Sequence, residues 1–143
     1  MQAAQKLAGL IRQFEGCRLK AYKCPAGVWT CGWGSTGPDV TEATAWTQAE
    51  ADKRMEADAT KFLNGILKLS PILKAHPNKL AAVADFAYNV GIGAYGKSTL
   101  RKMVDSEQWE AAVVEFRKWT KGGGKVLPGL VKRREAEVAL FLE

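Results

Sequence analysis

The sequence is poor in metal-binding residues and has no long apolar run. Its 143 residues include one histidine and three cysteines, with no Cys-x-x-Cys pair, so a structural zinc site is not expected. No apolar run approaches the ~20 residues of a membrane span, and the first residues lack the apolar core of a signal peptide. The chain as it stands is therefore expected to be made in the cytosol, with no means of exporting itself.

The composition is that of an ordinary globular protein. Apolar residues make up 47% of the chain and charged residues 25%, which argues against disorder. The length favours one domain, with room for two lobes. A formal net charge of +6 favours acidic partners, namely nucleic acid, anionic lipid or an anionic cell wall. Composition alone does not choose among these three.

Apolar spacing predicts several helices. Residues 2–14 carry apolar side chains at i, i+3, i+4 and i+7, and Glu15 continues this stripe unless it bends outward. A helix over 48–69 is predicted because Thr47 and Glu50 form a capping box and Pro71 follows its end. Further helices are expected near 79–90, 98–105, 107–119 and 129–142, with a break at 91–93 and a flexible loop at 122–124.

Residues 18–36 differ, because strand-forming side chains replace the helical pattern. The turn chemistry of residues 25–27 predicts a hairpin. Side chains alternate between the two faces of a strand, so Tyr22, Cys24, Val28 and Thr30 share one face. Cys24 and Thr30 are therefore expected to look into the same space.

Glu15, Cys24 and Thr30 are separated by eight and by five residues. A proton donor, a second ionisable group and a hydroxyl that holds water are the parts needed to hydrolyse a glycosidic bond. The segment resembles the catalytic region of the phage-type lysozymes (endolysins, glycoside hydrolase family 24), whose pattern is Glu, eight residues, Asp or Cys, five residues, Thr. Further blocks resemble the family in the same order: 29–36, 89–91, 98–101, and 127–130 with Arg133, Arg134 and Glu137.

The resemblance implies an α+β, mostly helical, lysozyme-like fold in a single domain over 1–143. A lobe with a small sheet (about 15–46), a connecting helix (about 48–69) and a helical lobe (about 71–143, packed with helix 2–14) are expected. The implied activity is that of a monomeric muramidase, which hydrolyses the β-1,4 bond between N-acetylmuramic acid and N-acetylglucosamine in peptidoglycan and lyses the host. No cofactor, metal or nucleic-acid partner is implied. Action in the periplasm or wall requires a holin or an export segment trimmed from this chain.

The resemblance also assigns roles to residues. Glu15 matches the general acid, which an apolar setting would keep protonated, and Thr30 matches the hydroxyl that orients the attacking water. Cys24 matches a position usually held by aspartate, and acts either as base toward water with inversion or as nucleophile through a thioglycosyl intermediate. Tyr88 and Thr99 are candidates for glycan contact.

The other two cysteines raise separate expectations. Cys17 is implied to form a regulatory disulfide with Cys24, the alternative being a small packing residue. Cys31 is expected to be a buried, inert thiol. Ser35 stands where many members carry histidine, so the ion pair from that position to the helical lobe is expected to be missing.

Two rival functions remain open at this point. In one, a protein whose enzyme site has decayed binds a wall or membrane through its charge, and a basic patch would serve it: Lys118, Lys121, Lys125, Lys132, Arg133 and Arg134. The alternative interpretation is that these residues form a solvated helix face with no binding role. The other rival is a cysteine hydrolase that pairs Cys24 with His76.

Overall fold

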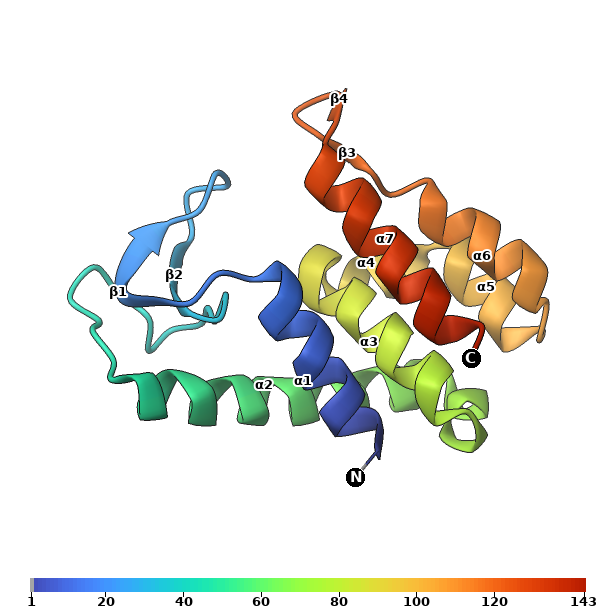
Figure 1. Cartoon of the computed structure of the whole chain (residues 1–143), viewed down its shortest axis with the longest axis horizontal. Coiled ribbons are helices and arrows are strands. Elements are labelled where there is room, and N and C mark those ends of the chain that lie inside the picture. The colour runs from blue at the N-terminus through green and yellow to red at the C-terminus, as the bar shows by residue number, and fades with distance from the viewer. Residues whose placement is uncertain (1) are drawn as a thin grey trace.

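The computed structural model describes residues 2–143 (Figure 1). Helix α1 (Gln2–Phe14) leads into a hairpin of β1 (Arg18–Lys23) and β2 (Trp29–Gly32), and a loop then reaches the long helix α2 (Gln48–Leu69). The remaining elements follow in order: η1 (Pro71–Ala75), α3 (Pro77–Val90), α4 (Ile92–Lys97), α5 (Thr99–Asp105), α6 (Trp109–Arg117), β3 (Lys121–Gly122), β4 (Lys125–Val126) and α7 (Pro128–Phe141). The predicted fold class, mostly helical with a small N-terminal hairpin lobe, is confirmed.

Helix α3 is the centre of the helical lobe and packs against α1, α2 and α7. Its residues 80–87 are all buried, and four of them are alanines, which let neighbouring helices approach closely. Phe86 in this run makes edge-to-face contacts with Phe116 and Trp119, a favourable geometry for aromatic rings. This apolar centre fixes where α3 and α7 present their few polar side chains.

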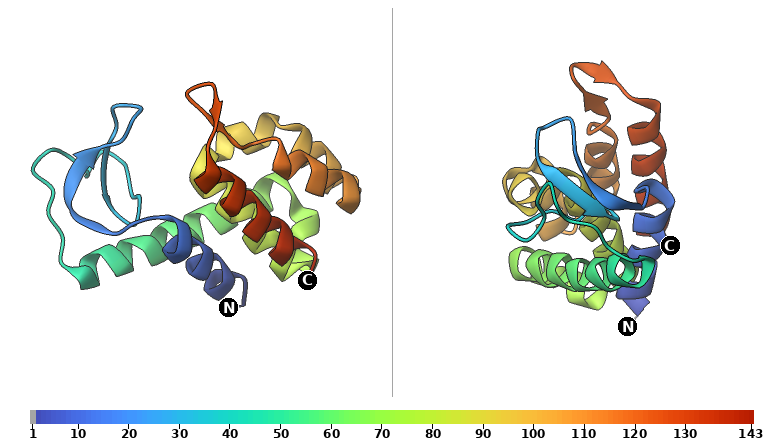
Figure 2. Two further views of the ribbon diagram at one scale, coloured as in Figure 1. Left: turned by 45° about the horizontal axis from the view of Figure 1, so that its top comes forward. Right: turned by 90° about the vertical axis from the view of Figure 1, so that its left-hand side faces the viewer.

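Helix α2 joins the two lobes (Figure 2). Its N-terminus carries the predicted capping box between Thr47 and Glu50, and it ends at Leu69 with Ser70 as C-cap. The side chains of Arg54 and Asp58 come from the turns of α2 that face the hairpin lobe.

Hydrogen bonds tie the hairpin lobe to α2. The hydroxyl of Ser35 donates to Asp58 at 2.6 Å, and the indole of Trp33 donates to Asp52 at 2.8 Å. Arg54 also binds Asp58, with 3.0 Å between Nε and Oδ1. At the position where many members of the resembling family carry histidine, Ser35 thus links the hairpin lobe to the connecting helix.

Two segments differ from the sequence-based expectation. The break predicted at 91–93 is confined to Gly91, because α4 already begins at Ile92, and residues 121–126 form the β3–β4 hairpin where a flexible loop was predicted at 122–124. Gly123 (φ 60°) and Gly124 (φ 80°) take the left-handed backbone that a tight two-residue hairpin turn requires. The run of three glycines has no side-chain alternation from which strands could be predicted. The sequence therefore did not indicate this hairpin.

Across residues 2–143, no helix combines the length and the apolar character that crossing a membrane requires.

Candidate active site

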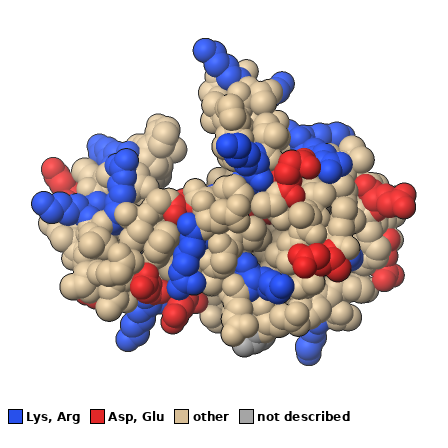
Figure 3. Space-filling model, in the orientation of Figure 1, with Lys and Arg blue, Asp and Glu red and all other residues tan. Residues whose placement is uncertain are grey.

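A cleft of about 600 Å³ lies between the hairpin lobe and the helical lobe. Figure 3 shows the surface hollowed between the small lobe and the projecting β3–β4 hairpin. Residues from the segment after α1, from the hairpin and its loops, and from α2 and α3 line the cleft: Glu15, Tyr22, Cys24, Pro25, Ala26, Thr30, Gly34, Thr36, Arg54, Asp58, Lys61, Phe62, Tyr88 and Asn89. The structure thus brings the three predicted catalytic residues and Tyr88 to one space.

Glu15 follows directly after α1, with its backbone N–H donating to the carbonyl of Ile11 at 2.8 Å. Its side chain is 23% exposed, and its Oε2 lies 2.7 Å from Nη1 of Arg133. The expectation of an apolar setting for this carboxyl is therefore wrong. The guanidinium comes from α7, 118 residues away, where the periodicity of α1 gives no information.

The opposite side of Glu15 contacts the backbone of the loop after β2. Gly34 has a φ of 85°, and a Cβ built on it would lie 2.8 Å from Oε1 of Glu15. Only glycine allows both this backbone conformation and this close approach. Glu15 is thus held between a guanidinium and a glycine.

The hairpin positions Cys24 and Thr30 as the alternation predicts. Tyr22 of β1 pairs with Thr30 of β2, and the turn is closed by backbone bonds between Cys24 and Val28 (3.0 Å) and between Gly27 and Cys24 (2.8 Å). Thr30 is 4% exposed, and its hydroxyl donates to the carbonyl of Val28 at 3.0 Å.

The turn also changes the chemistry of the thiol. Backbone hydrogen bonding, that of Val28 foremost, lowers the pKa of Cys24. Hydrogen bonds to a thiolate favour the charged form. The lowering comes from the turn itself rather than from the nearby basic side chains of β1, so the geometry of the hairpin favours a thiolate at this position.

Tyr88 and Phe62 form an apolar wall of the cleft, with ring centroids 5.1 Å apart. The Tyr88 hydroxyl donates to the carbonyl of Trp33 at 2.7 Å, and burial raises the pKa of this phenol, so it stays protonated. Thr99, the other predicted glycan contact, is exposed at the start of α5 and is not part of the cleft lining.

Sequence reasoning missed the residues beneath Glu15. Arg133 binds Asp85 through two bonds of 2.9 Å. Arg133 and Arg134 are 4% and 0% exposed, so assigning them to a basic surface patch was wrong. They point toward α3, and the available signal was Asp85, the only charge in the otherwise apolar run 80–87.

The remaining cysteines and His76 lie elsewhere. Cys31 is fully buried, donates weakly to the carbonyl of Arg18 at 3.5 Å, and has its pKa raised by burial. The thiol of Cys17 lies 3.6 Å from the amide nitrogen of Gln48. His76 packs edge-on against Trp109, away from the cleft lining.

All three cysteines are free in this structure. The pairing of Cys17 with Cys24 therefore stays a prediction. Because His76 is not part of the cleft lining, the structure does not assemble the Cys24–His76 hydrolase. Within residues 2–143, no three His, Cys, Asp or Glu side chains gather as metal ligands.

A mostly helical chain with a hairpin lobe, a connecting helix and a glutamate in the cleft between its lobes has the lysozyme-like fold. In agreement, the family described as Phage lysozyme matches residues 12–137. The chain belongs to this family.

Individual relatives agree with the assignment. The endolysin of Acyrthosiphon pisum secondary endosymbiont phage 1 is 40% identical over 99% of this chain and 98% of its own length. The endolysin of Bacillus phage B103 is also 40% identical over 99% of this chain, which spans only 54% of that protein. Among solved structures, the muramidase domain of SpmX from Asticaccaulis excentricus superposes with a TM-score of 0.83, at 29% identity, covering 97% of this chain and 95% of its own.

Proposed function

We propose that this protein is an endolysin-type muramidase that hydrolyses the β-1,4 bond between N-acetylmuramic acid and N-acetylglucosamine of peptidoglycan and so lyses a bacterial cell. The observation that carries the proposal is the cleft that brings Glu15 together with Cys24 and Thr30. The names of the relatives, endolysin and muramidase domain, support the same substrate.

In this proposal, Glu15 protonates the leaving glycosidic oxygen. The attacking water is held by the hairpin. Because the Thr30 hydroxyl gives its own proton to the Val28 carbonyl, it is left to accept a hydrogen bond from water. The Cys24 thiolate accepts the other proton, so a lone pair of the water oxygen is free to attack the anomeric carbon.

This arrangement makes Cys24 a base and gives inversion. A nucleophilic thiolate would instead form a thioglycosyl intermediate and give retention. Proton NMR of the first sugar product distinguishes the two, because only the retaining route yields a β-anomer. A β-anomeric first product would overturn the assignment of Cys24 as base.

The walls of the cleft fit a glycan strand. Phe62 and Tyr88 offer apolar surface to a sugar face, and the Tyr88 oxygen, whose proton is committed to Trp33, accepts hydrogen bonds from sugar hydroxyls. Thr99 lies outside the lining, and we retain it only as a contact for parts of peptidoglycan that extend beyond the cleft.

The test is release of reducing ends from purified peptidoglycan. Glu15→Gln is expected to lower turnover by at least ~10²-fold, the usual scale for a positioned general acid. Glu135→Gln is the matched control, because it removes one carboxylate from exposed α7 surface, where Glu135 pairs with Arg117. Turnover in Glu15→Gln equal to that of the control would contradict the proposal.

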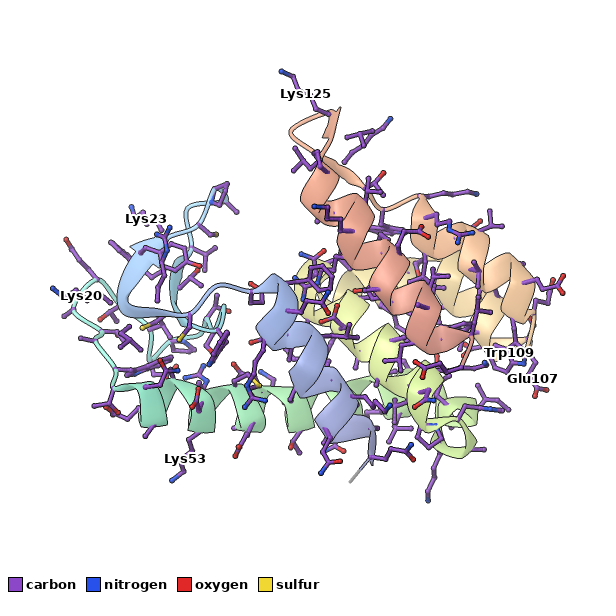
Figure 4. All side chains as sticks on the ribbon, viewed as in Figure 1. Lys20, Lys23, Lys53, Glu107, Trp109 and Lys125 are labelled. Atoms are coloured by element: carbon purple, nitrogen blue, oxygen red, sulfur yellow. The ribbon has the colours of Figure 1, made fainter. Side chains whose placement is uncertain are left out.

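A second candidate function is binding to an anionic wall or outer membrane through charge. Lys20 and Lys23 project from the hairpin lobe and Lys125 from the tip of the β3–β4 hairpin, on either side of the cleft (Figure 4). We propose that these lysines aid attachment of a monomeric enzyme. Bacterial killing that persists in full after Glu15→Gln would favour the binding function over the enzyme.

We further propose that the enzyme is made in the host cytoplasm, acts on the wall and is silenced by a Cys17–Cys24 disulfide, which removes the thiolate. The free thiol of Cys24 in the cleft supports only the active form. Activity should fall under mild oxidation and return with dithiothreitol, while Cys17→Ser stays active. Full activity in protein shown by peptide mapping to carry the Cys17–Cys24 disulfide would contradict this proposal.

A further inference from the structure

Five charged side chains meet beneath the cleft, where α3, α7 and the end of α1 converge. Arg133 is 5% exposed, and Asp85, Arg134 and Glu137 are fully buried in their side chains, while Glu15 alone reaches the cleft at 23%. Buried charges are costly unless each is matched by a partner. The balance of charge in this cluster therefore sets the electrostatic potential at the Glu15 carboxyl.

The guanidinium of Arg133 is divided unequally between two carboxylates. Its Nε and Nη2 both bind Asp85, each at 2.9 Å, and only Nη1 binds Glu15, at 2.7 Å. A guanidinium forms its strongest bond to a carboxylate through two parallel N–H groups. Asp85 takes that bidentate site, so Glu15 is left with a single contact and faces a charge that another carboxylate already offsets.

Glu137 lies on the far side of the same guanidinium. Its Oε2 is 3.8 Å from Nε of Arg133 and its Oε1 is 3.4 Å from Nε of Arg134, and both oxygens lack a hydrogen-bond partner among the described residues. Burial, together with the neighbouring Asp85, raises the pKa of Glu137 well above its usual range. With Glu137 neutral, Asp85 is the buried carboxylate that offsets the charge of Arg133.

We propose that Asp85 and Glu137 act as positioning residues, which together carry one negative charge beside Arg133 and thereby keep it from holding Glu15 in its ionised form. This inference deepens the proposed function, on which its catalytic meaning rests. In a muramidase, an ionised Glu15 has no proton to give to the leaving oxygen. The buried pair thus lets the acid keep an arginine contact and still be protonated.

The other groups near Glu15 come from β1 and α3. Tyr22 and Tyr88 each have their phenol pKa raised, chiefly by burial and in part by the charge of Glu15. Both stay neutral at working pH. Among the residues named here, the charge that faces Glu15 directly is therefore that of Arg133, and changes in the pair reach Glu15 through it.

The pair predicts a pattern across three variants. Glu137→Gln removes a neutral carboxyl, so the pair keeps the charge of Asp85. In Asp85→Asn, Glu137 is expected to lose its proton. Its carboxylate, 3.8 Å from Nε of Arg133, then offsets the arginine charge in part. Only Asp85→Asn with Glu137→Gln removes the charge altogether, and Arg133 then acts on Glu15 undiminished.

The experiment is a carboxyl ¹³C NMR titration of Glu15 in protein labelled at glutamate. The titration midpoint of Glu15 is expected to fall by about one pH unit in the double variant, since an uncompensated opposite charge lowers a carboxyl pKa by roughly 1–3 units. It should fall less in Asp85→Asn and stay unchanged in Glu137→Gln. In the double variant, kcat at neutral pH should fall about tenfold with KM unchanged, because one pH unit is a tenfold change in the protonated fraction. Glu135→Gln, on the exposed side of α7, should change neither quantity.

An unmoved Glu15 midpoint in the double variant would overturn the inference, even if the wild type is fully active. An inactive wild type with the expected shift would instead contradict the proposed function and leave the inference standing. If the double variant does not fold, the wild type, labelled also at aspartate, still decides: two ionised carboxyls at Asp85 and Glu137 at pH 7 would refute the single negative charge.

Discussion

Replacing Gly34 with alanine tests whether the position of Glu15 depends on the backbone beside it. The added Cβ would lie 2.8 Å from Oε1 of Glu15, closer than a Cβ approaches other atoms in proteins, and 3.1 Å from Cδ, which is tighter than most such contacts. The carboxyl must therefore move by several tenths of an ångström. The φ of 85° adds a second effect, because a residue with a side chain costs about 1–2 kcal/mol in the left-handed region.

The two effects are measured separately. Displacing the carboxyl is expected to lower kcat on peptidoglycan by about 10- to 100-fold, since a misplacement near 1 Å costs up to about 10²-fold. The backbone strain is expected to lower the free energy of unfolding in urea by about 1–2 kcal/mol. Gly124→Ala is the matched control, because Gly124 has a φ of 80° with nothing within 4 Å of the added Cβ.

The control should lose similar stability and keep full activity. If Gly34→Ala turned over peptidoglycan as fast as Gly124→Ala does, the contact between Gly34 and Glu15 would have no role in placing the acid. The reasoning from the close approach would then be refuted, whatever the stability data showed.

Three further outcomes are expected. Ser35→Ala removes the 2.6 Å bond to Asp58 and should lower the free energy of unfolding by about 2 kcal/mol, as for bonds to charged groups; an unchanged urea midpoint would contradict this. Glu137 has a raised pKa in the folded protein, so its stabilisation is present below the ordinary glutamate pKa and is lost as pH rises, by up to about 1.4 kcal/mol per pH unit; Glu137→Gln should remove this slope in urea unfolding between pH 5 and 7, and an equal slope in both proteins would refute it. Cys24→Asp should keep substantial muralytic activity because a carboxylate also serves as base, whereas Cys24→Ser should lose most of it; full activity in the serine variant would exclude both roles of the thiol.

Local patterns in the sequence predicted the parts of the fold that depend on neighbours along the chain. The capping box at Thr47 fixes where α2 begins, and Ser70 and Pro71 fix where it ends. The alternation along β1 and β2 correctly placed Cys24 and Thr30 on the cleft side of the hairpin. These predictions needed only the periods of a helix and a strand.

The surroundings of Glu15 depend on contacts that no local period encodes. Arg133 is 118 residues away along the chain, and a basic residue on a C-terminal helix is usually exposed. A lone carboxylate in an apolar helix needs a buried partner, so Asp85 was the one local sign that a cation would be drawn into the core. The packing of α7 on α3 shows which arginine is that partner.

The two halves of the proposed reaction belong to different lobes. The acid and its buried charge pair lie on the helical lobe, whereas the thiol and hydroxyl that hold water lie on the hairpin. Polar links help to set their relative position, among them Tyr88 to the Trp33 carbonyl and Ser35 to Asp58 of the connecting helix. Each link is worth only about 1–3 kcal/mol, while the apolar centre around α3 holds the helical lobe together. Weakening a link should therefore reduce catalysis before it unfolds the protein, because the reacting groups separate when the lobes shift.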